Sequence, residues 1–366
     1  MKLSGEVVYI FAYDIAYDMK REPVTSLLGQ PVVQFEVGIS RHSPKQLFFY
    51  RPQTVRLPPV ERVGPQGPVT VSRAVKLFPV GAVSISVRVP FKDQRLADLV
   101  AWHFLTFDGV RVEDEVKTLA EQVQNDLGSH IVRPVQELAN EEAYTVFCID
   151  QASQSQEGGP SAETWLLERR REVAALLMEE RDAAHLSEQE ADESTGINLS
   201  YHDRDIAVID WDAALVIDEP KNFEETLHIM ELANVQLAEL ETYDRTLDGT
   251  LEASYRDLRA RRPGVRGEVL QSLREIRIDL ARLSDELSNI TKFFGDWHLA
   301  RIYQGLSARF HLAEWTRTID QKLQTLDELY QLLKQEQLNR WMLMLEVAIV
   351  LLFIIDLIIL VFGLVK

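Results

Sequence analysis

The sequence has little that could staple the chain covalently or bind a polyanion. Cys148 is the only cysteine, which excludes an intrachain disulfide. Lysine and arginine number 39 against 57 aspartates and glutamates, so the formal net charge is −18. Because phosphate backbones are bound by clustered basic side chains, this balance argues against binding of nucleic acid. It also argues against adsorption of the acidic part onto anionic lipid.

Sequence motifs of common catalytic sites are also missing. The chain has no Walker A motif, no GxGxxG after a strand, no HExxH and no GxSxG. Its 8 histidines show no zinc-type spacing. His103 falls on the apolar face of an expected helix, where a packed core histidine is the simplest interpretation. We therefore predict no cofactor, and the sequence favours a non-catalytic role.

An N-terminal export signal is absent as well. The first apolar run is interrupted by Asp14 and Asp18, and no cleavage site of small residues follows it. We interpret this run as a first strand. Without such a signal, the large acidic part is expected to stay in the cytosol.

The sequence does contain one long hydrophobic run, from Val347 to Val365. At about 1.5 Å per residue it spans roughly 28 Å, close to the ~30 Å hydrocarbon core of a bilayer. We predict a single transmembrane anchor within residues 341–366. The protein would then be tail-anchored and single-pass, with its N-terminal domain in the cytosol.

Asp356 interrupts this run, and Gly363 lies on the same stripe of the expected helix. An ionisable residue at this depth costs about 2.5–3.5 kcal/mol on insertion scales. One interpretation is that Asp356 contacts a partner, a lipid headgroup or a neighbouring anchor, with Gly363 allowing close approach of two backbones. The other is that protonation and local thinning of the membrane make the residue tolerable.

Residues 1–220 predict an α+β domain. Alternating or β-branched segments predict strands at 6–13, 32–38, 46–50, 69–79, 83–90, 141–149, 197–201 and 206–217. Amphipathic segments predict helices at 93–107, 116–138 and 164–180. We expect a loop or sheet edge at the proline-rich stretch 51–68, a flexible linker at 151–160 and a mobile acidic loop at 182–196. This order of elements predicts helices packed on an antiparallel sheet.

Residues 221–340 predict an all-α region. Pro263-Gly264 separates two helical segments that should pack as an antiparallel hairpin, and a third segment runs into the anchor. The second segment has an uninterrupted coiled-coil seam, and a seam this narrow is buried only against another helix of the chain or another copy. Its residues form the predicted oligomer interface: Val269, Leu273, Ile276, Leu280, Leu283, Leu287 and Ile290.

A cluster of aspartates provides one candidate metal site. If 206–217 is a single strand, Asp210 and Asp212 lie on one face. Two carboxylates there could bind Mg²⁺ or Ca²⁺, which prefer oxygen ligands. The simpler interpretation is a turn at these residues between two short strands. The first interpretation supports an alternative function, a metal- or ligand-responsive enzyme or sensor tethered to the membrane.

The C-terminal pattern resembles an uncharacterised family of membrane proteins. Leu345-Glu346 opens the anchor, and Asp356 follows Glu346 after a run of aliphatic residues. This spacing, with the order of α+β domain, helices and one anchor, resembles the mitochondrial proteins required for meiotic nuclear division and their bacterial relatives. The resemblance implies a membrane-anchored homo-oligomer without established catalysis. We accordingly predict a membrane-anchored scaffold or interaction protein that self-associates through its helical region.

Overall fold

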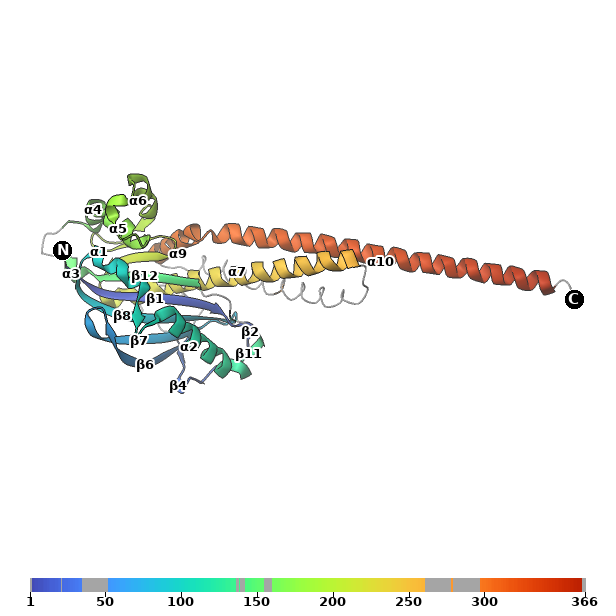
Figure 1. The fold of residues 1–366 in the computed structure, drawn as a ribbon, viewed down its shortest axis with the longest axis horizontal. Coiled ribbons are helices and arrows are strands. Elements are labelled where there is room, and N and C mark those ends of the chain that lie inside the picture. Colours follow the sequence, from blue (N-terminus) through green and yellow to red (C-terminus); the bar gives the residue numbers. More distant parts are fainter. Residues whose placement is uncertain are drawn as a thin grey trace. The chain divides into compact units, whose positions relative to one another are not determined.

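A computed structural model describes residues 2–20, 22–34, 52–135, 138, 142–154, 160–260, 278 and 297–363. The chain divides into two compact units, residues 1–242 with 281–316 and residues 243–280 with 317–366. The first unit contains the sheet and the helices around it, and the second is helical (Figure 1). The predicted order is thus confirmed: a mixed α+β domain, then helices, with one apolar helix near the C-terminus.

Nine strands of the described ranges form one sheet, in the order β13-β14-β15-β12-β1-β8-β7-β6-β5. Their bounds are Leu3–Asp14 (β1), Val33–Gln34 (β5), Gln53–Gly64 (β6), Gly67–Leu77 (β7), Ala82–Gln94 (β8), Glu142–Asp150 (β12), Asn198–Leu199 (β13), Ile206–Ile209 (β14) and Ala213–Asp218 (β15). Neighbouring strands are antiparallel except for β12 and β15, which are parallel. The sheet is therefore mixed rather than purely antiparallel.

Short pairs of strands and several helices complete the first unit, and the label η marks a 3₁₀ helix. The pairs are β2 (Ala16–Met19) with β11 (Ile131–Pro134), β3 (Ser26–Leu27) with β4 (Gln30–Pro31), and β9 (Thr106–Phe107) with β10 (Val110–Arg111). The helices are α1 (Leu96–Leu99), η1 (Val100–Phe104), α2 (Val112–Asp126), η2 (Leu127–Ser129), α3 (Gln151–Gln154), α4 (Ala162–Glu168), α5 (Arg170–Leu177), η3 (Ala183–His185), α6 (Glu188–Ser194), η4 (Pro220–Asn222), the first part of α7 (Phe223–Ala260) and α9 (Trp297–Arg309).

The two faces of the sheet are buried against different partners. Side chains alternate between the faces along a strand. On one face, Tyr9 of β1 and Phe147 of β12 join a core that includes Val116 of α2 and Leu176 of α5. The other face meets α7 in a smaller apolar cluster: Ala12, Phe78, Ala82, Leu232, Val235 and Ala238. Helices therefore cover both faces.

Strand β6 occupies most of the proline-rich stretch that was predicted to be a loop or a sheet edge. Pro58 and Pro59 lie where the register with β7 shifts, between Leu57 and Val60. A bulge accommodates prolines because the residues in it need not donate to the ladder. On its other side β6 pairs with only two residues of β5 within the described ranges. The loop prediction is thus wrong, and the edge prediction stays a prediction because residues 35–50 lie outside the described residues.

Two further predictions of local structure are wrong. Helix α2 ends at Asp126, and the residues near Pro134 instead form β11, because Ile131 pairs with Met19 of β2. The expected acidic loop contains η3 and α6, each opened by a side-chain cap. Asp182 accepts a hydrogen bond from the backbone N–H of Ala184, and Ser187 accepts one from that of Glu190. These caps stabilise short helices that have few large apolar residues.

The second unit contains the later part of α7 and most of α10 (Leu312–Gly363). Within it, Nζ of Lys322 lies 2.7 Å from carboxylate oxygens of both Asp244 and Asp248. Its buried apolar residues include Leu247, Ile319, Leu323 and Leu326. The two helices therefore pack together at this point.

The predicted coiled-coil seam lies outside the described residues. This applies to all seven of its residues: Val269, Leu273, Ile276, Leu280, Leu283, Leu287 and Ile290. The antiparallel coiled coil accordingly stays a prediction.

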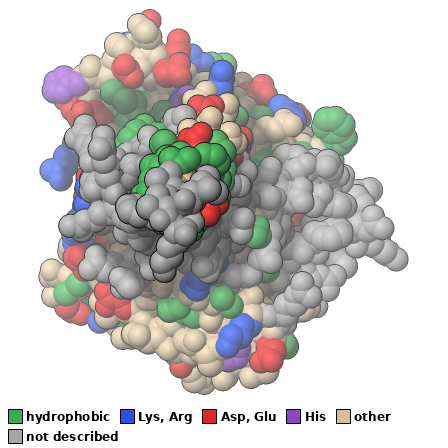
Figure 2. Space-filling view, turned by 90° about the vertical axis from the view of Figure 1, so that its right-hand side faces the viewer, with side chains coloured by type: hydrophobic (Ala, Val, Ile, Leu, Met, Phe, Trp, Pro, Cys, Tyr) green, Lys and Arg blue, Asp and Glu red, His purple; other side chains and the backbone are tan. Residues whose placement is uncertain are grey.

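Near the C-terminus, α10 contains one segment that is long and apolar enough to cross a membrane. Trp341–Ile359 comprises 19 residues with a mean hydropathy of 2.8, and none of its hydrophobic stretch is buried. Figure 2 shows hydrophobic side chains gathered at the surface around the end of the molecule that faces the viewer. This segment begins six residues before the run at Val347 and includes Asp356.

Candidate functional site

A cavity of about 180 Å³ lies on the face of the sheet that packs against α2 and α5. Its lining comes from segments far apart in the sequence. Tyr9 and Phe11 come from β1, His103 from η1, and Glu179 from the segment after α5. Asp212 comes from the turn between β14 and β15. The fold therefore brings together aromatic, acidic and imidazole side chains in one place.

The side chain of His103 is an enclosed polar group of this cavity, with 1% of it exposed. Its Nε2 lies 2.8 Å from the carbonyl oxygen of Leu176. Because a carbonyl only accepts, Nε2 carries a proton. Its Nδ1 lies 3.2 Å from Oε1 of Glu179, and this contact requires one proton, on either the ring or the carboxyl. The imidazole also packs edge-on against Phe147, with ring centroids 4.9 Å apart.

The backbone of Glu179 has an unusual conformation. Its φ is +58°, in the left-handed region that favours glycine. For a residue with a side chain, this conformation costs about 1–2 kcal/mol. Glu179 follows Met178, the C-cap of α5, and the N–H of Glu180 donates to the carbonyl of Ala175 at 2.8 Å. A left-handed residue with this hydrogen bond is a common way for a helix to end, and in this ending the Glu179 carboxyl lies beside His103.

Three titratable groups of the cavity influence one another. Burial lowers the pKa of His103, which the Leu176 carbonyl and the Asp212 carboxylate partly counteract. Burial raises the pKa of Glu179, and the charge of Asp212 raises it further. Burial and then the neighbouring Asp210 raise the pKa of Asp212, whereas His103 lowers it. Coupled, shifted groups around a cavity are typical of functional sites.

The structure separates the two aspartates that the sequence offered as a metal site. They lie in a turn between β14 and β15, so the premise of a single strand is wrong and the turn interpretation is confirmed. Asp210 is buried and accepts hydrogen bonds from Ser194 Oγ and, at 2.9 Å, from its neighbour's backbone N–H. Its Oδ1, which accepts the bond from the backbone of Trp211, also lies 3.4 Å from Nε of Arg309. Asp212 instead lines the cavity.

The metal site at this pair therefore stays a prediction without a geometric basis. Among the residues that the structure describes, no three His, Cys, Asp or Glu side chains are grouped as metal ligands. The other predicted site residues, Asp356 and Gly363, lie in α10, where the side chain of Asp356 is exposed.

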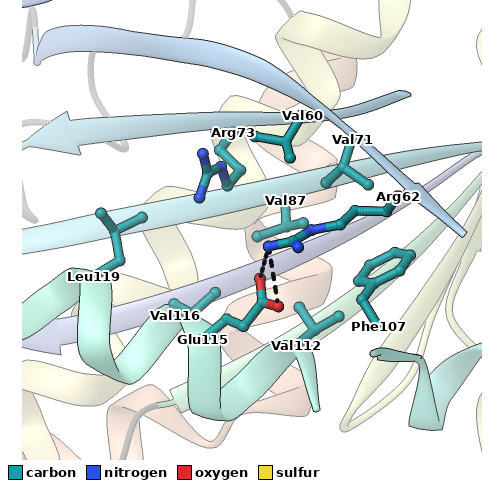
Figure 3. Close-up of a pocket in the computed structure, with 10 residues that line it drawn as sticks. All are labelled: Val60, Arg62, Val71, Arg73, Val87, Phe107, Val112, Glu115, Val116 and Leu119. Carbon is teal, nitrogen blue, oxygen red and sulfur yellow. Dashed lines mark hydrogen bonds and ion pairs between the residues drawn. The ribbon is translucent and has the colours of Figure 1, made fainter. Parts of the chain in front are cut away.

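A second cavity, between β6, β7, β8 and α2, is much smaller, at about 20 Å³ (Figure 3). Arg62 of β6 reaches across it, with Nη2 3.4 Å from both carboxylate oxygens of Glu115. Its Nη1 lies 3.3 Å from Asp108. Valines and Leu119 line most of the remaining wall. This volume suffices for about one water molecule, which is too little for an organic ligand. We therefore interpret the contact between Arg62 and Glu115 as an ion pair that joins the sheet to α2.

A buried ion pair lies on the opposite face of the sheet. Lys76 of β7 contacts Glu231 of α7, with 4% and 2% of their side chains exposed. Nδ1 of His228 lies 3.9 Å from the same carboxylate. Burial alone would raise the pKa of Glu231, but the Lys76 ammonium and then His228 outweigh it and hold the pKa at about 2. This cluster therefore keeps two full charges inside the domain.

Comparison with known families finds a match to most of the first unit. A family model described as "Uncharacterized protein MJ0711, N-terminal domain" matches residues 4–224. The chain belongs to this family. The match to the MJ0711 N-terminal domain family extends from β1 to the start of α7, and it includes every residue that lines the larger cavity.

One relative is Uncharacterized protein MJ0711 of Methanocaldococcus jannaschii, which is 23% identical to this chain over 219 residues. The aligned part is 59% of this chain and 65% of the relative, so the chain spans a little under two thirds of the relative's length. No solved structure matches the chain.

Proposed function

We propose that the chain is a membrane-anchored scaffold or interaction protein that self-associates as a homo-oligomer. The observation that supports this best is the exposed apolar segment Trp341–Ile359 of α10. Water-soluble proteins rarely expose a contiguous apolar surface of this size, whereas a bilayer solvates it. We also propose that this segment is a tail anchor and that the N-terminal domain lies on the cytosolic side of the membrane. The resemblance to the meiotic nuclear division proteins is part of the same proposal.

Asp356 supports the self-association part of the proposal. Its side chain is exposed among apolar neighbours in the segment that would lie in the bilayer. An isolated carboxyl at that depth costs about 2.5–3.5 kcal/mol. A polar contact with a second anchor lowers this cost, and Gly363 on the same stripe permits close packing. We therefore place the contact between copies at this stripe as well as in the helical region.

The anchor can be tested by adding charge to it. Replacing Leu351 and Ile355 together by arginine should release the protein from membranes, because each arginine at the centre of a span costs about 2.5–3.5 kcal/mol. The measurement is the fraction of full-length protein that stays in the membrane pellet after an alkaline wash. The matched control replaces the same two residues by alanine and should stay in the pellet. An arginine variant that pellets like the unmodified protein would show that this segment does not span the bilayer.

The role of Asp356 can be tested separately. Asp356→Leu should weaken association of detergent-solubilised protein about 3- to 30-fold, the equivalent of one interhelical hydrogen bond worth about 0.6–2 kcal/mol. Mass measured by light scattering across a dilution series reports this change. Asp356→Asn keeps a hydrogen-bonding group and should associate more strongly than the leucine variant, and Ile358→Leu serves as a neutral control. A monomeric unmodified protein would contradict self-association altogether.

The larger cavity favours a second function, in which the N-terminal domain binds a small molecule and acts as a membrane-tethered sensor. A space of about 180 Å³ accommodates several non-hydrogen atoms. Its polar groups have shifted pKa values, and its entire lining lies in the part of the chain shared with the family. These features support ligand binding, and the chemistry of the lining indicates which ligand.

A further inference from the structure

We propose that the cavity beside His103 binds a compact organic cation, a primary ammonium group carried by a short aliphatic body. This inference rests on the ligand-binding function proposed above and adds the chemical class of the ligand.

The floor of the cavity is apolar and carries no charge. Tyr9 and Phe11 are 4% and 2% exposed and present their rings to the space. The hydroxyl of Tyr9 donates to the backbone carbonyl of Trp102, so its proton is already in use. Burial keeps this phenol neutral by raising its pKa. A ligand body that reaches the floor therefore gains most if it is aliphatic.

The mouth of the cavity has an excess of negative charge. Arg111 is the one basic residue of the lining apart from His103, and its Nη1 lies 2.9 Å from the carboxylate of Glu113. A second carboxylate, that of Asp114, lies 3.5 Å from its Nε. Arg111 is therefore already balanced by its own neighbours. The carboxyl of Glu179 lies 3.2 Å from Nδ1 of His103, and the charge of His103 also acts on Asp212.

These two carboxyls create the preference for a cation. Each is partly removed from water, and the charge of Asp212 acts on Glu179. A bound ammonium would donate hydrogen bonds to both and cancel this repulsion. Phe104 of η1 lines the same cavity and is 54% exposed, so its ring is available for cation–π contact. A carboxylate ligand would meet repulsion, and a neutral alcohol would leave the charges uncompensated.

The test compares three ligands of the same shape on the full-length protein in detergent. Isobutylammonium, isobutanol and isobutyrate share one branched carbon skeleton and differ in charge. Isothermal titration should show binding of isobutylammonium, with the alcohol and the carboxylate at least tenfold weaker. Glu179→Gln and Asp212→Asn should each weaken isobutylammonium about tenfold. The control Glu180→Gln alters a neighbouring residue that does not line the cavity and should bind as the unmodified protein does.

The outcomes separate this inference from the function on which it rests. If the three ligands bind equally, the cavity is a ligand site but its preference for a cation is wrong. If none of them binds to the unmodified protein, the ligand-binding function and the cation preference both fall. If isobutylammonium binds equally to both amide variants, the ammonium does not sit between Glu179 and Asp212. The comparison of ligands on the unmodified protein decides the matter even where a variant does not fold.

Discussion

Lys76→Met is expected to lower the free energy of unfolding of the N-terminal domain by about 3–5 kcal/mol. The variant leaves Glu231 without its main partner, in a position where 2% of its side chain is exposed. A buried carboxylate without a partner is destabilising because the protein no longer compensates for its lost hydration. Urea unfolding of the two proteins, followed by circular dichroism, measures the difference.

Two further variants test this explanation. Replacing Lys76 and Glu231 together by methionine should restore much of the lost stability, since two apolar side chains need no charge partner. Lys221→Met removes a surface lysine that pairs with Glu219 while 75% exposed, and it should change stability by less than about 1 kcal/mol. If Lys76→Met unfolds at the same urea concentration as the unmodified protein, the buried pair is not important for stability.

The same pair predicts the direction of a pH dependence. The pKa of Glu231 is about 2 in the folded protein, below its ordinary value of 4.5. A carboxyl whose pKa falls on folding stabilises the folded state above its unfolded pKa. This contribution disappears as the pH falls from about 4.5 towards 2. The stability difference between Lys76→Met and the unmodified protein should therefore shrink over that acidic interval.

Phe147→Ala should lower the free energy of unfolding by a similar amount, about 3–5 kcal/mol. Phe147 is 0% exposed, and its strand β12 pairs with β1 on one side and with β15 on the other. Its ring also packs edge-on against the imidazole of His103, which lines the cavity. The alanine variant thus leaves a void in the core and removes the support of the candidate site.

Chemical unfolding measures the first effect, and the NMR signals of the His103 ring report the second. Phe147→Leu fills most of the void and should be much closer to the unmodified protein. Leu167→Ala, at a residue that is 61% exposed, should change stability by no more than about 0.5 kcal/mol. Equal stability of Phe147→Ala and the unmodified protein would contradict the assignment of this ring to the core.

Those parts of the fold that depend on local pattern were predictable from the sequence. The strands at 6–13 and 141–149 are confirmed as β1 and β12, and those at 69–79 and 83–90 as β7 and β8, which pair with each other. The membrane-length apolar run is confirmed as part of one long helix. These features follow from hydrophobicity and periodicity over a few residues. Asp182 and Ser187 are typical helix N-cap residues, but the prediction of a loop rested on the acidic composition around them.

The order of strands and the candidate site could not be predicted in this way. The parallel pairing of β12 with β15 spans helices α3 to α6, and no local pattern indicates it. The cavity depends on that pairing, because it brings Asp212 to the same place as η1, which carries His103, and the end of α5, which carries Glu179. His103 is a packed histidine, as expected, and it also lines the cavity. Glu179 had no signal in the sequence, since its importance comes from a contact with a residue far away in the chain.

Helix α9 has a consequence for the biogenesis of this protein. It lies beyond the family match, yet it belongs to the first unit. Arg309 contacts Glu193 and Asp210, and the rings of Phe310 and Tyr144 pack 5.2 Å apart. A ribosome releases the sheet first and α9 only shortly before the apolar segment Trp341–Ile359. The first unit therefore cannot finish folding before α9 has left the ribosome, and only a short part of the chain then separates its completion from synthesis of the apolar segment Trp341–Ile359.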